Sequence, residues 1–246
     1  MKKRYFFFFI LAFMAMAAWS HITDKPYNAN PFAASEEADS SLAPYLHFRE
    51  SMQSKIRHIH GYVKADKLPR SLLRAVVSVE DKRFYDHGAV DPVGIIRAGA
   101  VNLYAGKTVE GGSTISQQVI KNTFLSQERT VSRKAKELLL AILLERNYTK
   151  DEILAIYLNT AYFGADATGI AQASHTYFAV EPENLTLAQS SMLAGLLQAP
   201  TYYNPLENYK AAKERQQTVL AQMTESGFIS ADEARRAYEE DLHLQK

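Results

Sequence analysis

The spacing of apolar residues changes from a continuous run at the start of the chain to helical periods in the rest. Apolar side chains fill Tyr5–Trp19, and from Gly61 onward they recur at intervals of three and four residues. Pro69 is typical of the first turn of a helix, and the apolar positions Val76 and Val77 follow it on one face. The chain contains no convincing alternating run and no internal repeat of solenoid length. The pattern therefore predicts a mainly α-helical domain.

Capping residues mark where helices begin and end in the chain after Gly61. A Ser or Thr followed three residues later by Glu or Gln is typical of a capping box, and the chain contains three, at Thr149–Glu152, Thr186–Gln189 and Ser230–Glu233. Gly227 follows the stretch that begins near Asn208, and we expect it just beyond the end of that helix. Each start opens an apolar period, so these signals predict separate helices.

The N-terminus places Lys2, Lys3 and Arg4 before the apolar run. The fifteen residues Tyr5–Trp19 rise only about 22 Å as a helix, short of a hydrocarbon core of about 30 Å. Extension to Ile22 gives eighteen residues, enough to cross a bilayer with slight thinning. The alternative is a signal peptide cleaved after small residues near position 18. In either case the basic flank stays cytoplasmic and the rest of the chain is exported.

Composition narrows the class of protein. The 246 residues are 47% hydrophobic, enough for one well-buried domain with appendages. The net charge of +1 argues against a nucleic-acid partner, and the absence of cysteine excludes disulfides and thiolate metal sites. Residues 23–60 show no clear period, so we expect a stem there that contains a helix around 45–57.

Glu80 is the first candidate for chemistry. It lies four residues after Val76 and continues the apolar face of that helix. Loss of hydration on such a face would raise the pKa of the carboxyl toward the range useful for a general base. The alternative is an exposed glutamate at a helix end beside Asp81, Lys82 and Arg83.

The stretch GGSTISQQVIKN is the second candidate. Gly111 and Gly112 allow close backbone approach, and the helix that follows presents free N–H groups. Thr114, Gln118 and Lys121 fall on one face of that helix, where a lysine is a charge suited to phosphate. The alternative is a capped amphipathic helix with a polar surface. The lysine has the wrong spacing for a Walker loop.

The helix opened by Ser132 carries the third candidate. Residues 138–144 are all apolar, so we expect this to be the central buried helix of the core. Arg133, Lys134 and Glu137 share one stripe of it, as either a structural ion-pair cluster or part of a cleft.

Together these stretches resemble the peptidoglycan glycosyltransferases of glycosyltransferase family 51. Members occur as the N-terminal module of bifunctional penicillin-binding proteins and as monofunctional transglycosylases. The resemblance runs from about Gly61 to about Leu242 and rests on five ordered motifs. These match Glu80, Asp81, Phe84 and His87; Gly111–Asn122; Arg133, Lys134, Glu137 and Glu145; Lys150, Tyr157, Leu158, Asn159 and Gly164; and Gly169, Ile170 and Ala173.

The resemblance implies a lysozyme-like helical fold and transfer from lipid II with inversion and release of undecaprenyl pyrophosphate. Glu80 would be the base, and Glu137 a second carboxylate near the pyrophosphate, with a divalent cation, Mg or Mn, as an optional partner. Asp81, Phe84, His87, Gly111, Gly112 and Gly169 would be structural. The implied set for substrate and pyrophosphate binding is Arg83, Ser113, Thr114, Gln118, Lys121, Arg133, Lys134 and Asn159.

The resemblance also bears on location. It favours an uncleaved anchor over residues 1–22, a stem over 23–60 and a catalytic domain over 61–242 outside the bacterial cytoplasmic membrane. Pro92–Tyr104 would correspond to a lobe that dips into the membrane, with a plain packed helix as the alternative. The chain length leaves no room for a transpeptidase domain. The implied partners are lipid II, the growing lipid-linked glycan and other cell-wall synthesis proteins.

Two other functions are compatible with the sequence. A lysozyme-like glycan hydrolase would share the fold and a catalytic glutamate, but it has no need for the basic set of Lys121, Arg133 and Lys134. A non-catalytic cell-wall scaffold would not need Glu80 and Glu137.

Overall fold

The computed structural model describes residues 42–106, 111–125 and 130–245. Within these ranges the structure is helical, and its one strand-like pairing is a bridge between Tyr162 and Thr168. The prediction of a mainly α-helical domain is therefore confirmed. The longer helices are α3 (Phe48–Arg57), α4 (Arg70–Glu80), α5 (Pro92–Ala105), α6 (Ile115–Phe124), α7 (Val131–Asn147), α8 (Lys150–Thr160), α9 (Ile170–Phe178), α10 (Leu187–Leu196), α11 (Tyr209–Glu225) and α12 (Ala231–Glu239).

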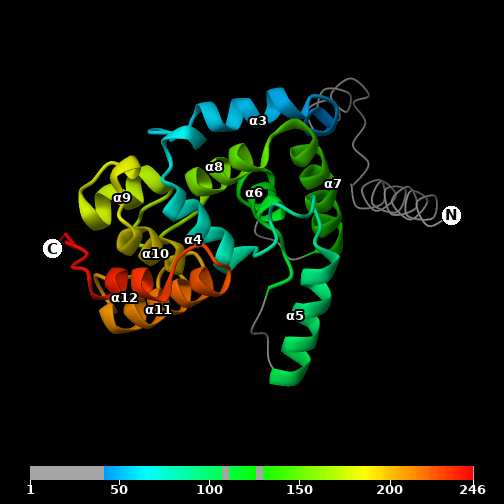
Figure 1. The fold of residues 1–246 in the computed structure, drawn as a ribbon. Helices are drawn as coiled ribbons and strands as arrows, with labels where there is room; N and C mark the ends of the chain where they lie inside the picture. Colours follow the sequence, from blue (N-terminus) through cyan, green and yellow to red (C-terminus); the bar gives the residue numbers. More distant parts are fainter. Residues whose placement is uncertain (1–41, 107–110, 126–129, 246) are drawn as a thin grey trace.

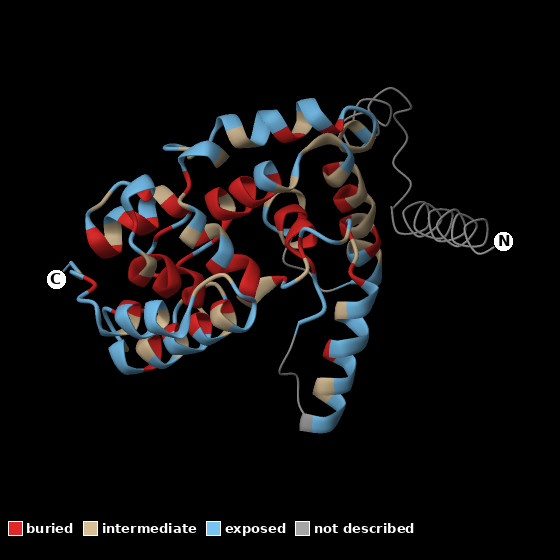
Figure 2. Ribbon diagram, in the orientation of Figure 1, coloured by how far each residue is buried: buried red, intermediate tan, exposed pale blue. Residues whose placement is uncertain are grey.

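The helices form a packed body from which α5 extends (Figure 1). On one side α10 packs against α4 and α11, and α12 lies along α11. On the other side α6 packs against both α7 and α8. Figure 2 shows the buried residues gathered in the interior of this body, whereas α5 is largely exposed. The end of α4 meets the start of α6 between these two sides, because Asp81 accepts a hydrogen bond from the Ile115 N–H.

The central helices of the core are α8 and α10, so the prediction that the helix after Ser132 is central was wrong. Nine of the ten residues of α10 are buried, against five of the seventeen in α7. The sequence of α10 looks less apolar because it contains Ser190 and Ser191. These hydroxyls are small enough for close helix packing and are satisfied inside the core: Ser190 pairs with Ser71, and Ser191 donates to a carbonyl of its own helix.

Most predicted helix boundaries agree with the structure. Two starts differ by one or two residues: Pro69 is the N-cap of α4, not its first residue, and α7 is capped by Thr130, not opened by Ser132. All three capping boxes are present, at the starts of α8, α10 and α12. Gly227 follows α11 with a φ of 70°, in the left-handed region that favours glycine. The helix expected within the stem is α3, and its Phe48 and Met52 are buried in the core. Helix α3 therefore packs as part of the domain.

None of the helices within the described ranges combines the length and apolarity needed to cross a bilayer. The predicted N-terminal span, at residues 1–22, lies outside the part of the chain that the structure describes.

Candidate active site

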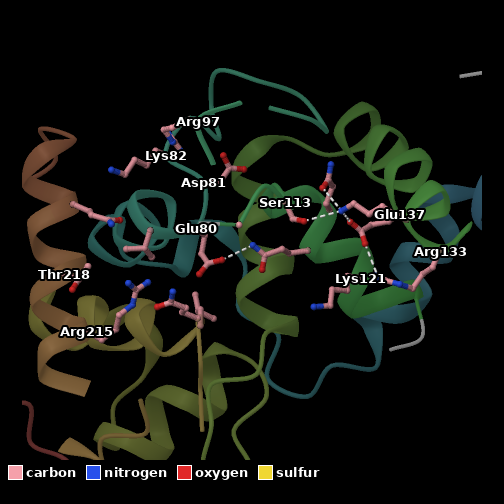
Figure 3. A pocket seen from close by; sticks show the side chains of 18 residues that line it. Glu80, Asp81, Lys82, Arg97, Ser113, Lys121, Arg133, Glu137, Arg215 and Thr218 are labelled. Atoms are coloured by element: carbon pink, nitrogen blue, oxygen red, sulfur yellow. Dashed lines mark hydrogen bonds and ion pairs between the residues drawn. The ribbon is translucent and has the colours of Figure 1, made fainter. Parts of the chain in front are cut away.

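A pocket of about 670 Å³ opens where α4 ends. Its walls come from helices α4, α5, α6, α7 and α11 and from the loops that follow α4, precede α6 and follow α10. Figure 3 shows Glu80 between two groups of side chains, with Arg215 and Thr218 on one side and Ser113, Lys121 and Glu137 on the other. The lining residues with polar side chains are Glu80, Asp81, Lys82, Arg97, Ser113, Gln117, Gln118, Lys121, Arg133, Lys134, Glu137, Gln198, Arg215, Thr218 and Gln222.

Glu80 is the last residue of α4, and its partly buried carboxylate faces the pocket. Gln118 on α6 donates from Nε2 to Glu80 Oε2 at 2.9 Å, a contact marked in Figure 3. Burial raises the pKa of Glu80 above its ordinary value of 4.5, while the Gln118 hydrogen bond and the Arg215 charge oppose that shift. A carboxyl in this setting is suited to take up a proton.

Glu137 forms an ion-pair cluster with two cations on its own helix. Arg133 lies one turn back, with its guanidinium 3.4 Å from Glu137 Oε2, and Lys134 pairs with Oε1. Lys134 also reaches α6 and its preceding loop, donating to Gln117 Oε1 at 3.1 Å and to Ser113 Oγ at 3.2 Å. The buried carboxylate thus holds both cations at the pocket wall, where phosphate oxygens would meet them.

A second polar cluster fixes the loop after α4. Asp81 accepts from the backbone N–H of Ile115 at 3.1 Å and pairs with His87 Nε2 at 2.7 Å. Asp91 caps the start of α5 through Val93, and Arg83 lies 3.5 Å from it. Because Asp81 binds the first turn of α6, this cluster ties the end of α4 to the helix that carries Gln118 and Lys121.

The structure brings together most of the predicted site residues. Glu80, Gly111, Ser113, Gln118, Lys121, Arg133, Lys134 and Glu137 all line the pocket. Three predicted binding residues do not line it. Arg83 turns to Asp91, while Thr114 is buried as the N-cap of α6. Asn159 is 2% exposed and bonds both the N–H and the carbonyl of Val63, so its place is structural.

The residues expected to be structural differ in burial and in the space around them. Phe84 is fully buried, with the Lys150 ammonium 4.3 Å from its ring centre. Gly169 has a φ of +89°, and an added Cβ would lie 2.9 Å from the Asn159 carbonyl oxygen. Gly111 and Gly112 have room for a Cβ in the structure, so the described neighbours impose no steric need for glycine there.

Several pocket residues were missed by the sequence interpretation. Gln117 lies within the stretch Gly111–Asn122, but it was not among the residues assigned to the polar face of that helix. Arg215, Thr218 and Gln222 come from α11, whose sequence carries no motif. Only the packing of α11 against α4 places them opposite Glu80. The buried Arg215 Nε and Gln222 Oε1 have no hydrogen-bond partner among the described residues.

The charge of the lining decides which ligands suit it. Six basic side chains (Lys82, Arg97, Lys121, Arg133, Lys134, Arg215) face three acidic ones (Glu80, Asp81, Glu137). This excess favours an anionic ligand such as a pyrophosphate. Glu137 is a poor fit for the optional divalent cation, because both of its oxygens already pair with cations. Among the described residues, three that could ligate a metal converge, Asp81, His87 and Asp91, and each already has the hydrogen-bond or ion-pair partners given above.

The family model described as Transglycosylase matches residues 49–224. The chain belongs to this transglycosylase family. The family predicted from the five motifs is therefore confirmed, and the pocket lies inside the matched range.

Two named relatives and one solved structure are similar to this chain. Penicillin-binding protein 1A of Neisseria flavescens is 46% identical over 185 residues, 75% of this chain and 23% of that protein. A Cupriavidus necator protein named as a transglycosylase is 45% identical over 188 residues, 76% of this chain and 81% of that protein. The crystal structure of penicillin-binding protein 1A from Haemophilus influenzae is 24% identical, with a TM-score of 0.45, covering 75% of this chain and 18% of that one. The chain spans about a quarter of the length of the penicillin-binding proteins it matches.

Proposed function

We propose that this protein is a peptidoglycan glycosyltransferase that polymerises lipid II into glycan strands. The observation that carries the proposal is the position of Glu80, a carboxylate with a raised pKa, in a pocket lined by six basic side chains. Transfer of a sugar from a lipid pyrophosphate needs both features. It needs a base for the attacking hydroxyl and positive charge for the leaving group.

In the proposed reaction Glu80 takes the proton from the 4-hydroxyl of GlcNAc on lipid II. The freed oxygen attacks C1 of MurNAc at the end of the growing chain. The bond from C1 to the pyrophosphate oxygen breaks on the opposite face, so the configuration at C1 inverts. Lys121, Arg133 and Lys134 balance the charge of the departing undecaprenyl pyrophosphate.

We assign the acceptor sugar to the wall formed by α11 and the loop that follows α10. This wall lies across Glu80 from the basic cluster of α6 and α7, as Figure 3 shows for Arg215 and Lys121. The side chains of Arg215, Thr218 and Gln222 line this wall and carry hydrogen-bond donors and acceptors. Hydroxyl and N-acetyl groups of a sugar offer both.

The decisive experiment is polymerisation of purified lipid II by the full chain in detergent. The expected products are glycan strands and free undecaprenyl pyrophosphate. A parallel incubation with finished peptidoglycan tests the hydrolase alternative, which would release fragments from it without lipid II. A protein that binds glycan but yields neither product would support the scaffold alternative.

Replacing Lys121 by alanine is expected to weaken binding of a pyrophosphate-bearing substrate by about 10- to 100-fold, because a charge-assisted hydrogen bond contributes roughly 1.5–3 kcal/mol. Lys121 is exposed on the last turn of α6 and lines the pocket. Calorimetric titration with a phosphoglycolipid inhibitor measures the change. Lys210→Ala removes an exposed lysine of α11 outside the pocket and should leave the affinity unaltered. Equal affinities for both variants would refute the phosphate role of Lys121.

We also propose that the protein works at a membrane, with residues 1–22 as an uncleaved anchor and the domain outside the cytoplasm. A tethered enzyme gains effective concentration toward a substrate whose lipid tail stays in the bilayer. Helix α5 supports this placement, since Ile96, Leu103 and Tyr104 are 73%, 85% and 97% exposed. A mature N-terminus near residue 18 or 19, found by mass spectrometry, would show a signal peptide instead.

A chain that starts at Thr23 is expected to fold and to bind lipid vesicles weakly through α5. Changing both Ile96 and Leu103 to serine should reduce the bound fraction about tenfold or more, since each buried aliphatic side chain contributes roughly 1.5–3 kcal/mol. Vesicle flotation measures this fraction. Leu206→Ser, at an apolar residue exposed elsewhere, is the control. If the chain that starts at Thr23 fails to float without any substitution, the membrane role of α5 is refuted.

A further inference from the structure

Glu80 is held by a chain of two hydrogen bonds that reaches into the core. The Tyr157 hydroxyl on α8 donates to Gln118 Oε1 at 3.2 Å, and Gln118 Nε2 donates to Glu80 Oε2 at 2.9 Å. Tyr157 is 2% exposed, so bulk water does not replace its partner. Three helices, α8, α6 and α4, thus meet in one polar line that ends on the carboxylate.

The orientation of the Gln118 amide decides which form of Glu80 it supports. A side-chain amide has a donor end and an acceptor end, and it can turn over by rotation of its last torsion. With the NH₂ group toward Glu80, it stabilises the carboxylate. With the oxygen toward Glu80, it would accept from the protonated acid and stabilise that form instead.

Tyr157 opposes the turned-over arrangement. In the observed orientation the hydroxyl proton of Tyr157 is accepted by Gln118 Oε1. If the amide turned over, that buried hydroxyl would face NH₂ and its proton would lose this acceptor, which is unfavourable. Burial, and next the nearby Glu80, raise the pKa of Tyr157 well above its ordinary value, so the hydroxyl keeps its proton at neutral pH.

We propose that Tyr157 is a positioning residue that keeps the NH₂ group of Gln118 toward Glu80 and so favours return of Glu80 to the carboxylate after each transfer. The inference rests on the proposed role of Glu80 as the base. In each cycle the acceptor O–H bond breaks and the proton moves to Glu80 as the new C1–O bond forms. That proton must then pass to water before the next acceptor binds, and an amide that donates favours its departure.

Other groups that face Glu80 are unaltered by a change at Tyr157. Arg215 on α11 favours the carboxylate, whereas the neighbouring Asp81 disfavours it. Helix α10, which also packs on α4, has no titratable side chain. The Tyr157 hydroxyl also favours the carboxylate directly, as the smallest of the effects on the pKa of Glu80. The double variant with Gln118→Met, described below, separates this direct effect from the chain through Gln118.

The test is Tyr157→Phe in the full chain. Lipid II polymerisation at neutral pH should fall about 2- to 10-fold, the effect of one net hydrogen bond, through kcat with KM little altered. The acidic limb of the kcat profile should move to higher pH, and activity should recover as the pH is raised. Infrared difference spectra against Glu80→Gln report the protonation of Glu80 directly. They should show the same shift without any substrate.

Tyr177→Phe is the matched control, because its buried hydroxyl donates to the Phe163 carbonyl at 2.9 Å. It should lower the melting temperature without moving the pH profile. Gln118→Met should shift the profile in the same direction as Tyr157→Phe, and the double variant should shift it no further than Gln118→Met alone. If Tyr157→Phe folds poorly, Gln118→Met alone still tests the proposal. It must shift the titration of the Glu80 carboxyl if the Gln118 amide stabilises the carboxylate.

The outcomes separate the two proposals. An inactive wild-type protein would refute the proposed function, while the infrared titration would still report on Tyr157. An active wild type whose profile and infrared titration coincide with those of Tyr157→Phe would overturn the positioning role. Additive shifts in the double variant would overturn it as well, because they would mean that Tyr157 does not act through Gln118.

Discussion

Replacing Glu80 by glutamine is expected to lower the rate of lipid II polymerisation by about 10²–10⁴-fold or more, the usual effect of losing a positioned base. The side chain keeps its shape, and Gln118 Nε2 still finds an oxygen to donate to. Substrate affinity should therefore stay close to that of the wild type. The measurement is a single-turnover polymerisation assay with calorimetric binding of a phosphoglycolipid inhibitor alongside.

The same variant should be more stable than the wild type at neutral pH. The pKa of Glu80 is raised in the folded state by burial, so the folded state disfavours the carboxylate relative to the unfolded chain. The resulting cost in stability is absent below the unfolded pKa, grows between the unfolded and folded pKa values, and is fully present above the folded one. Glu80→Gln removes it. The melting temperature of the variant should exceed that of the wild type at neutral pH, and the difference should close in acid.

Glu239→Gln is the control for both measurements, because Glu239 is also the last residue of a helix, α12, but is exposed. It should alter neither the rate nor the pH dependence of melting. Residual activity of Glu80→Gln above about a tenth of the wild-type rate would remove Glu80 from the role of base.

Replacing Gly169 by alanine is expected to destabilise the fold by about 3 kcal/mol or more. Gly169 has a φ of +89° and a ψ of 151°, a backbone region that is nearly restricted to glycine and costs other residues roughly 1–3 kcal/mol. The added Cβ would also lie 2.9 Å from the Asn159 carbonyl oxygen, so α8 and α9 would have to separate. Urea denaturation measures the loss as a lower midpoint.

Gly227→Ala isolates the backbone part of this effect. Gly227 also has a positive φ, +70°, but a Cβ there would meet nothing within 4 Å. It should cost only about 1 kcal/mol. Equal midpoints for the two variants would show that the contact with Asn159 has no part in the stability of the α8–α9 junction.

Local sequence signals were enough to place the helices and the basic half of the site. Capping boxes and Gly227 depend on residues three or four apart, so they are readable without knowledge of the fold, and the structure agrees with them. Arg133, Lys134 and Glu137 likewise share one helix, where their mutual contacts follow from its period.

Contacts between distant segments required the tertiary structure. Asn159 looked like a binding residue, but the chain brings it to the backbone of Val63, 96 residues away. Arg215 reaches Glu80 only because α11 packs on α4, and no local pattern in α11 marks it. The burial of α10 was missed for a related reason, since whether a serine is exposed or satisfied in a core depends on its partner. The sequence determined which helices form and what charges they carry. The packing of those helices decided which side chains share the pocket, because burial and hydrogen bonding are properties of neighbours in space.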